Sequence, residues 1–379
     1  MGFSIASFYG SNDIGKEVVA RMQNSTTEYA NKIANQSNSS SSASKNPTNK
    51  NPEKPRKQAI FSHKNTFNKK RSNKVRKRKE FKFNSVIEFW DTFRSDQDCI
   101  DYLEEVRWDG QPESPFDPTS KVYKCKNRKY KCKNKNKYFT VLTGTIFEGS
   151  RIPLRSWFYA LYCLTNIKTG KSALQISKDI HISHYRTLKM LHKIRECILG
   201  AENYNVLDGI VLTDETFIGG KDKNRHWNKK AKYAKENDDR NFVDKIPVVG
   251  YMNANGLLTA RVVPSVSANT LLNCALTFIK PGSTVYSDDW KGYKDFHKYY
   301  EHFFVEHGKR KYVNGKVTTN KLEGAWTQLK RISSTYHHVS PKYLQLYVNE
   351  FVFRYNTLKM KDTDRFIWGL QLSKKQEAA

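Results

Sequence analysis

The chain has 379 residues, which is enough for two or three domains with a full-sized core. Its 66 Lys and Arg outnumber 37 Asp and Glu, giving a formal net charge of +29. Residues 45–79 hold 14 of these bases and one acid, and residues 1–44 hold three of each, so +16 remains on the other 300 residues. Because the charge is not confined to a tail, composition disfavours an ordinary metabolic enzyme and indicates a polyanionic partner, most simply nucleic acid.

The six cysteines are scattered, and the sequence shows neither a signal peptide nor an apolar run of membrane length. Cys163, Cys197 and Cys274 lie among apolar residues, as buried free thiols do. The sequence therefore predicts a protein without membrane spans in a reducing, intracellular compartment. That compartment is the cytoplasm in a bacterium, with association to the nucleoid, or the nucleus in a eukaryotic host.

The N-terminal region divides into two parts. Residues 1–80 are rich in Asn, Ser, Lys and Pro and are predicted to form a disordered, basic extension whose end binds phosphates non-specifically. Residues 81–150 are predicted to contain a helical stretch followed by a small module of short strands. Cys125 and Cys132 lie in this module without a second Cys-x-x-Cys pair, so a four-ligand zinc site is not expected.

Residues 151–204 show helical periodicity with a break near residues 181–183. The pattern fits a helix-turn-helix DNA-binding region, although an ordinary helical hairpin fits it equally well. In the second helix, the positions expected to face inward are Tyr185, Leu188, Leu191, Ile194 and Ile198. The positions expected to face outward, toward DNA, are Arg186, Lys189 and Lys193.

Residues 205–360 alternate between strand and helix patterns, which predicts an α/β domain, and residues 361–379 are taken as a C-terminal tail. The expected strands and helices are a strand at 210–213, a hairpin at 246–263 turning at 253–256, a helix at 267–279, strands at 283–286 and 303–305, and helices from Asn320 and at 342–358.

Three carboxylates stand out in this domain. Asp214 and Asp288 each follow an apolar strand, so they are expected at one edge of a sheet. Glu323 lies three residues after Asn320, a spacing that on its own indicates a capping box. Carboxylate oxygens are the ligands that Mg²⁺ prefers, and two such ions about 4 Å apart can assist phosphoryl transfer. Lys330, two helical turns after Glu323, is placed to contact a substrate phosphate.

Five stretches in order make residues 138–358 resemble the bacterial insertion-sequence DDE transposases related to Merlin (ISXO-like) elements. These stretches are Phe139–Phe147; Asp214–Lys221 with Asn224–His226; Ser287-Asp288 with Gly292-Tyr293; Thr319–Gly324 with Trp326 and Leu329–Arg331; and Glu350-Phe351 with Phe353–Asn356. The resemblance implies a ribonuclease-H-like catalytic domain that cleaves DNA at element ends and transfers the strands to target DNA. It also implies Mg²⁺ or Mn²⁺ as cofactor, terminal inverted repeats and target DNA as partners, and a homodimer or higher oligomer on DNA.

The resemblance assigns the metal ligands to Asp214, Asp288 and Glu323, with Lys330 beside them. Asn320 is the alternative third ligand, because some relatives use Asn, but Glu323 is favoured because its charge better neutralises an ion. Asp289 is the alternative to Asp288. Arg225 and His226 either reach DNA or belong to a solvated loop. Trp326 is expected to pack in the core.

The chain also departs from the family pattern. Relatives carry a four-cysteine zinc ribbon where this chain has Ser114, Asp117, Cys132 and Lys135, so the ribbon is expected to persist without zinc. Two other functions therefore stay open: a related metal-dependent nuclease that cuts without joining, and a catalytically inactive DNA-binding derivative.

Overall fold

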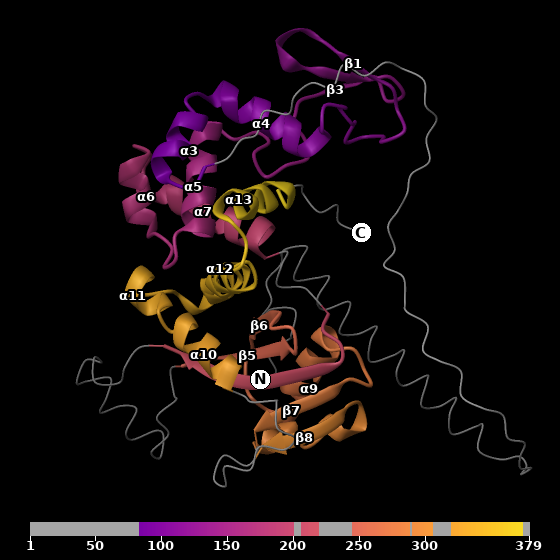
Figure 1. Ribbon diagram of the computed structural model, residues 1–379, viewed down its shortest axis with the longest axis vertical. Helices are drawn as coiled ribbons and strands as arrows, with labels where there is room; N and C mark the ends of the chain where they lie inside the picture. Colours follow the sequence, from indigo (N-terminus) through magenta and orange to yellow (C-terminus); the bar gives the residue numbers. More distant parts are fainter. Residues whose placement is uncertain (1–82, 201–205, 220–244, 289, 306–319, 374–379) are drawn as a thin grey trace, which may run out of the picture.

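The computed structural model describes residues 83–200, 206–219, 245–288, 290–305 and 320–373. Two groups of elements are visible, a helical group carrying a small sheet and a five-stranded sheet with its own helices, and α12 lies between them (Figure 1). The basic extension, Asp289, Arg225 and His226 fall outside the described residues, so the predictions made for them remain predictions.

The helical group is built around one aromatic core. Phe83, Phe89, Phe93, Phe158 and Phe366 are all fully buried in it. Its helices are α3 (Val86–Thr92), α4 (Asp96–Trp108), α5 (Leu154–Asn166), α6 (Ala173–Asp179), α7 (His184–Ile194), the π-helix η2 (Arg195–Leu199) and α13 (Asp362–Gln371). Polar caps set where several helices begin, as in α4, where Ser95 and Asp98 form a capping box.

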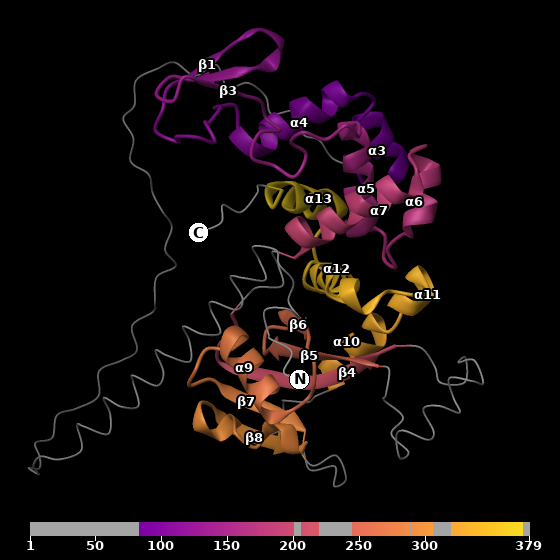
Figure 2. The same cartoon turned by 180° about the vertical axis from the view of Figure 1, so that it is seen from behind.

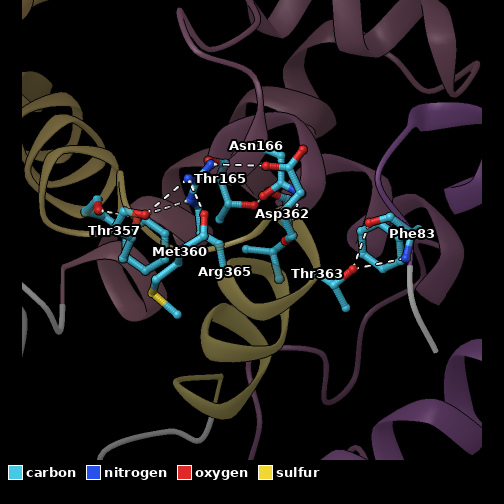
Figure 3. Close-up of polar contacts among 10 residues, drawn as sticks. Phe83, Thr165, Asn166, Thr357, Met360, Asp362, Thr363 and Arg365 are labelled. Carbon is cyan, nitrogen blue, oxygen red and sulfur yellow. Dashed lines mark hydrogen bonds and ion pairs between the residues drawn. The ribbon is translucent and has the colours of Figure 1, made fainter. Parts of the chain in front are cut away.

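The last helix, α13, corrects the prediction of a C-terminal tail. Phe366 and Leu370 insert into the helical core, so much of this segment is part of the fold. Arg365 holds the helix in place (Figure 3). Its guanidinium donates to the carbonyls of Thr357 at the end of α12, Met360 in the turn before α13, and Thr165 near the end of α5. The Thr165 carbonyl lies in the last turn of α5, where helical carbonyls lack intrahelical partners, and the Thr357 carbonyl also accepts from the Met360 backbone N–H at 3.0 Å.

The small sheet is an antiparallel meander of β1 (Val122–Lys124), β2 (Tyr130–Cys132) and β3 (Lys137–Phe139). Cys132 is buried, and hydrogen bonds with Ser114 and Ser120 lower the pKa of its thiol. Asp117 accepts a hydrogen bond of 2.8 Å from Asn134. Hydrogen bonds from Thr119 and Asn134 lower the pKa of Asp117, and the charge of Lys135 adds to the effect. A lysine ammonium is not a zinc ligand, so the four ribbon positions do not fit a zinc site.

Two expectations for the second helix of the proposed helix-turn-helix are wrong. The buried stripe of α7 consists of Thr187, Met190, Leu191 and Ile194, at helical spacing. Tyr185 lies off that stripe and is 64% exposed, rather than facing inward. Lys193 lies beside the stripe, half-buried, and its Nζ donates to the Ile146 carbonyl at 2.7 Å, so it does not point outward. Arg186 and Lys189 are exposed, as predicted.

The second group is a five-stranded mixed sheet of β4 (Ile210–Ile218), β5 (Ile246–Asn253), β6 (Leu258–Val262), β7 (Thr284–Asp288) and β8 (Glu301–Val305). The strand order is β6-β5-β4-β7-β8. The first three strands pair antiparallel, whereas β7 and β8 run parallel to β4. The predicted hairpin joins β5 and β6, and Gly256 supplies the positive φ of +84° that its turn requires.

Helices cover both faces of this sheet, as the front and back views show (Figures 1 and 2). On one face lies α9 (Ala268–Phe278), which is capped by Ser267 and connects β6 to β7. Short turns of 3-10 helix at η5 (Lys291–Tyr293) and η6 (Phe296–Lys298) adjoin it. On the other face lie α10 (Asn320–Leu329), α11 (Ile332–Tyr336), η7 (Pro341–Tyr343) and α12 (Leu344–Asn356).

The helix α12 protects the open edge of the sheet. Asn356 both accepts from and donates to the backbone of Leu258, at 2.9 Å in each case. Gln345 does the same for β6, accepting from Val262 at 2.8 Å and donating to Ala260 at 3.3 Å. Because an unpaired strand edge invites association with other chains, these two amides protect the β6 edge of the sheet.

A buried ionic network joins the two groups. Glu350 of α12 is fully buried, and it pairs with Arg195 of η2 at 2.6 Å, with Arg354 and with the hydroxyl of Tyr336. Burial alone would raise the pKa of Glu350, but the two guanidiniums outweigh it and hold the pKa below its usual value. The network fixes the π-helix that ends the helical group against the sheet-covering helix. None of the helices in the described ranges has the length and apolarity to cross a membrane.

Candidate active site

The pairing of β4 with β7 explains why two distant aspartates meet. Leu212 lies beside Tyr286 in the parallel register, and the same register carried two residues further brings Asp214 beside Asp288. Asp288 ends β7, as predicted, but Asp214 lies in the middle of β4. The strand continues past Asp214 to Ile218 because β5 pairs with it along that whole length. Asp214 is therefore level with the end of β7 rather than at the end of its own strand.

A third carboxylate joins them that the sequence interpretation did not select. One carboxylate oxygen from each of Asp214, Glu215 and Asp288 lies within 4.8 Å of the others. Burial raises the pKa of Glu215 to about 8, and the charges of Asp288 and Asp214 contribute, whereas a hydrogen bond with Tyr293 opposes the shift. Tyr293 is buried and also lies 3.3 Å from the hydroxyl of Thr213. In the sequence, the only sign of this third ligand is that Glu215 directly follows Asp214. Strand alternation predicts that neighbouring side chains point to opposite faces of the sheet, so Glu215 was not expected to join Asp214.

Asp214 is held from two sides. The indole Nε1 of Trp326 donates to one carboxylate oxygen at 2.9 Å, and the backbone N–H of Glu215 donates to the other at 2.8 Å. Burial raises the pKa of Asp214, these two hydrogen bonds lower it, and the charges of Asp288 and Glu323 raise it further. The net direction is upward, because burial, with the two negative charges adding to it, outweighs the hydrogen bonds.

Trp326 packs in the core, as predicted, and its position also depends on a glycine. Gly250 lies opposite Asp214 in the β4–β5 register. A Cβ atom at Gly250 would lie 2.3 Å from the Cη2 atom of Trp326, which is closer than real contacts allow. Only glycine therefore lets the indole lie flat against β5 with its N–H directed at Asp214.

Glu323 lies on the exposed side of the first turn of α10. Its charge acts on Asp214, so it is near the carboxylate cluster, although it is outside the group of oxygens within 4.8 Å. The helix begins at Asn320, whose side chain lies outside the described part of the chain, so the predicted cap stays a prediction. Lys330 follows the last helical residue and is exposed, and its backbone N–H still bonds to the Trp326 carbonyl at 2.9 Å, so the helical turn continues to it.

The cluster has the chemistry of a site for a hard divalent cation. Three carboxylates close together raise one another's pKa, and a bound cation would remove that repulsion. The Oε1 atom of Glu215 is buried without a hydrogen-bond partner among the described residues, so an oxygen is available for such an ion. The donor set of carboxylate oxygens fits Mg²⁺ or Mn²⁺.

Comparison with known proteins agrees with this geometry. Residues 206–356 match the family described as ISXO2-like transposase domains. Over 274 residues, covering 69% of this chain and 92% of the relative, the chain is 26% identical to an uncharacterized protein in transposable element ISH50 of Halobacterium salinarum. Over 106 residues, covering 26% of this chain and 81% of the relative, it is 27% identical to an uncharacterized transposase-like protein of Haemophilus influenzae. Residues 206–356 therefore form an ISXO2-like transposase domain, the kind of domain that characterises insertion-sequence DDE transposases.

Proposed function

We propose that the chain cleaves DNA at the ends of its element in a metal-dependent reaction and joins the freed ends to target DNA. The observation that carries this proposal is the meeting of Asp214 and Asp288, 74 residues apart in sequence, at the end of β7. The strand order β6-β5-β4-β7-β8, with the first three strands antiparallel and the last two parallel to β4, supports a ribonuclease-H-like fold.

In this proposal Asp214 and Asp288 are the principal metal ligands. Glu323, or less favourably Asn320, completes the set from α10, and Glu215 adds a carboxylate to the same cluster. Two divalent ions, when bound, supply charge stabilisation for the attacking and leaving oxygens of a phosphodiester. Trp326 orients Asp214 through its indole N–H, so that the ligand oxygen does not depend on an incoming ion for its direction.

The reaction proceeds in two displacements. In the first, a water oxygen bonds to phosphorus and the P–O3′ bond breaks, which leaves a 3′-hydroxyl on the element end. In the second, that hydroxyl oxygen bonds to a phosphorus of target DNA, and the target 3′-oxygen leaves with a proton. Lys330 is proposed to contact the substrate phosphate from the end of α10.

The DNA-binding elements are proposed on the helical group. Helices α6 and α7 pack together, and the first turns of α7 present His184, Tyr185, Arg186 and Lys189 to solvent. The ammonium of Lys189 lies 4.5 Å from the ring centre of Tyr185, so both side chains occupy one exposed surface. This exposed basic and aromatic surface favours a helix-turn-helix that contacts DNA through α7. Lys193 is left out of this proposal because its ammonium is used within the fold.

The test is an assay of the full chain with Mg²⁺ or Mn²⁺ on duplexes taken from the DNA that flanks the coding region. Asp214→Asn, Asp288→Asn and Glu323→Gln are each expected to abolish strand cleavage and transfer while DNA binding is retained. Asn320→Ala is the matched control on α10 and is expected to stay active if Glu323 is the ligand. Cleavage without any joining would favour a nuclease, and binding without cleavage would favour an inactive derivative.

A homodimer or higher oligomer on DNA is also proposed, since one reaction involves two element ends. Light scattering of the chain with and without an element-end duplex tests this directly. A single copy of the chain on each duplex under cleaving conditions would contradict it.

A further inference from the structure

Trp290 is the most exposed of the tryptophans that the structure describes, with half of its surface open to solvent. A single exposed apolar side chain is ordinary on a protein surface and needs no special explanation. Its place in the chain is not ordinary, because it follows Asp288 by two residues. The side chain therefore leaves the backbone directly beside the carboxylate cluster.

The ring is held in one orientation. The backbone N–H of Trp290 donates to Oδ1 of Asp288 at 3.2 Å, which links the residue to the metal-binding carboxylate. The indole Nε1 lies 3.5 Å from the carbonyl oxygen of Val266, at the start of α9. A Cβ at Gly292 would lie 2.6 Å from Cδ1 and Nε1 of the indole, so the edge of the ring lies against the glycine backbone.

The remaining surface of the ring is open. No other aromatic ring in the described ranges packs against Trp290, whereas nearby Tyr293 packs against Phe296. The exposed side chains of Lys291 and Lys294 follow on the same turn and bring positive charge to this surface. An aromatic ring fixed along one edge, open elsewhere and flanked by cations is a surface on which a nucleic-acid base can stack.

We infer that Trp290 stacks against an unpaired base of the substrate DNA beside the scissile phosphate. This inference rests on the proposed function. The ring cannot reach between paired bases of an intact duplex, so the base must leave the helix to contact it. Because the indole already lies against Val266 and Gly292, and Asp288 holds the backbone N–H of the same residue, stacking orders little that was mobile before. Trp290 thereby positions the strand on the carboxylate cluster without taking part in bond breaking.

The experiment measures single-turnover cleavage by the full chain as a function of DNA concentration, on duplexes from the flanks of the coding region. Trp290→Ala is compared with Trp290→Phe, which keeps an aromatic face. Trp368→Ala is the matched control, since Trp368 is also exposed but lies on α13 in the other group of elements. A second set of duplexes carries one abasic nucleotide, placed in turn at each position near the cut.

Trp290→Ala is expected to raise the DNA concentration for half-maximal cleavage by about 5- to 150-fold, the usual range for one stacked base. Trp290→Phe is expected to regain most of that loss, and Trp368→Ala to match the wild type. At one position, the abasic nucleotide should raise the DNA concentration for half-maximal cleavage by the wild type by the same factor. It should leave that concentration unchanged for Trp290→Ala, because the abasic nucleotide and the substitution remove the same contact.

The inference is overturned if the wild type cleaves and Trp290→Ala cleaves with the same concentration dependence. It is also overturned if, at every position, the fold-changes caused by the abasic nucleotide and by Trp290→Ala multiply when the two are combined, because the ring and the base then act independently. Absence of cleavage by the wild type on every duplex would instead overturn the proposed function, and this inference with it.

Discussion

Replacing Trp326 with phenylalanine isolates the hydrogen bond that orients Asp214. The substitution removes the indole N–H, which donates to the carboxylate at 2.9 Å, and keeps an aromatic ring at a position that is only 4% exposed. A hydrogen bond to a charged group contributes about 1.5–3 kcal/mol. If the transition state needs the oriented carboxylate, the cleavage rate at subsaturating Mg²⁺ should fall about 10- to 150-fold.

The pH dependence should change as well. The Trp326 hydrogen bond lowers the pKa of Asp214 against the larger effect of burial, so its loss raises that pKa further. A metal ligand must be deprotonated, and the acid side of the rate profile should therefore move to higher pH. Excess Mg²⁺ should recover part of the rate, because the ion competes with the proton for the same oxygen.

The assay is single-turnover strand cleavage over a series of Mg²⁺ concentrations and pH values. Trp157→Phe is a matched control, since Trp157 is also 4% exposed and donates its indole N–H at 2.9 Å, but to Ser150 in the helical group. Both variants lose the same volume and one hydrogen bond. Equal losses of activity in the two variants, or an unchanged Mg²⁺ and pH dependence in Trp326→Phe, would refute the reasoning.

Two further predictions concern stability. Glu350→Gln leaves the guanidiniums of Arg195 and Arg354 without their carboxylate, so the free energy of unfolding measured with urea should fall by about 3–5 kcal/mol. The control is Asp91→Asn, in an exposed pair with Arg94, which should leave the free energy of unfolding unchanged. A similarly small effect at Glu350 would contradict the assigned network. In metal-free buffer the free energy of unfolding should fall as pH rises from about 4.5 to about 8, because the folded pKa of Glu215 lies above its ordinary value and the buried side chain must ionise in that window. Glu215→Gln should remove this contribution, and equal slopes in the wild type and the variant would show that Glu215 does not titrate there.

Sequence patterns predicted the parts of the site that depend on local order. The apolar run before Asp288, the turn at residues 253–256 and the helical pattern at residues 267–279 each depend on short-range chemistry, and all three elements are confirmed. The end of β4 was placed wrongly because strand length depends on the partner, and β5 continues to pair beyond Asp214.

The missed features are those that depend on contacts between distant segments. Glu215 enters the cluster because Asp288 and Tyr293 come to it from β7 and η5, which strand alternation alone does not reveal. The helix α13 is short, and the core that receives Phe366 is built from residues some 200 to 280 positions earlier. Trp326 was correctly placed in the core, but its bond to Asp214 depends on the space above Gly250, 76 residues away.

The most direct test of the central claim is the rate of element-end cleavage by Asp214→Asn and Asp288→Asn beside the wild type, at saturating DNA and Mg²⁺. The two carboxylates meet through the β4–β7 register, so each variant should lose cleavage while it binds the duplex as tightly as the wild type does. Cleavage at the wild-type rate by either variant would contradict the assignment of the active site.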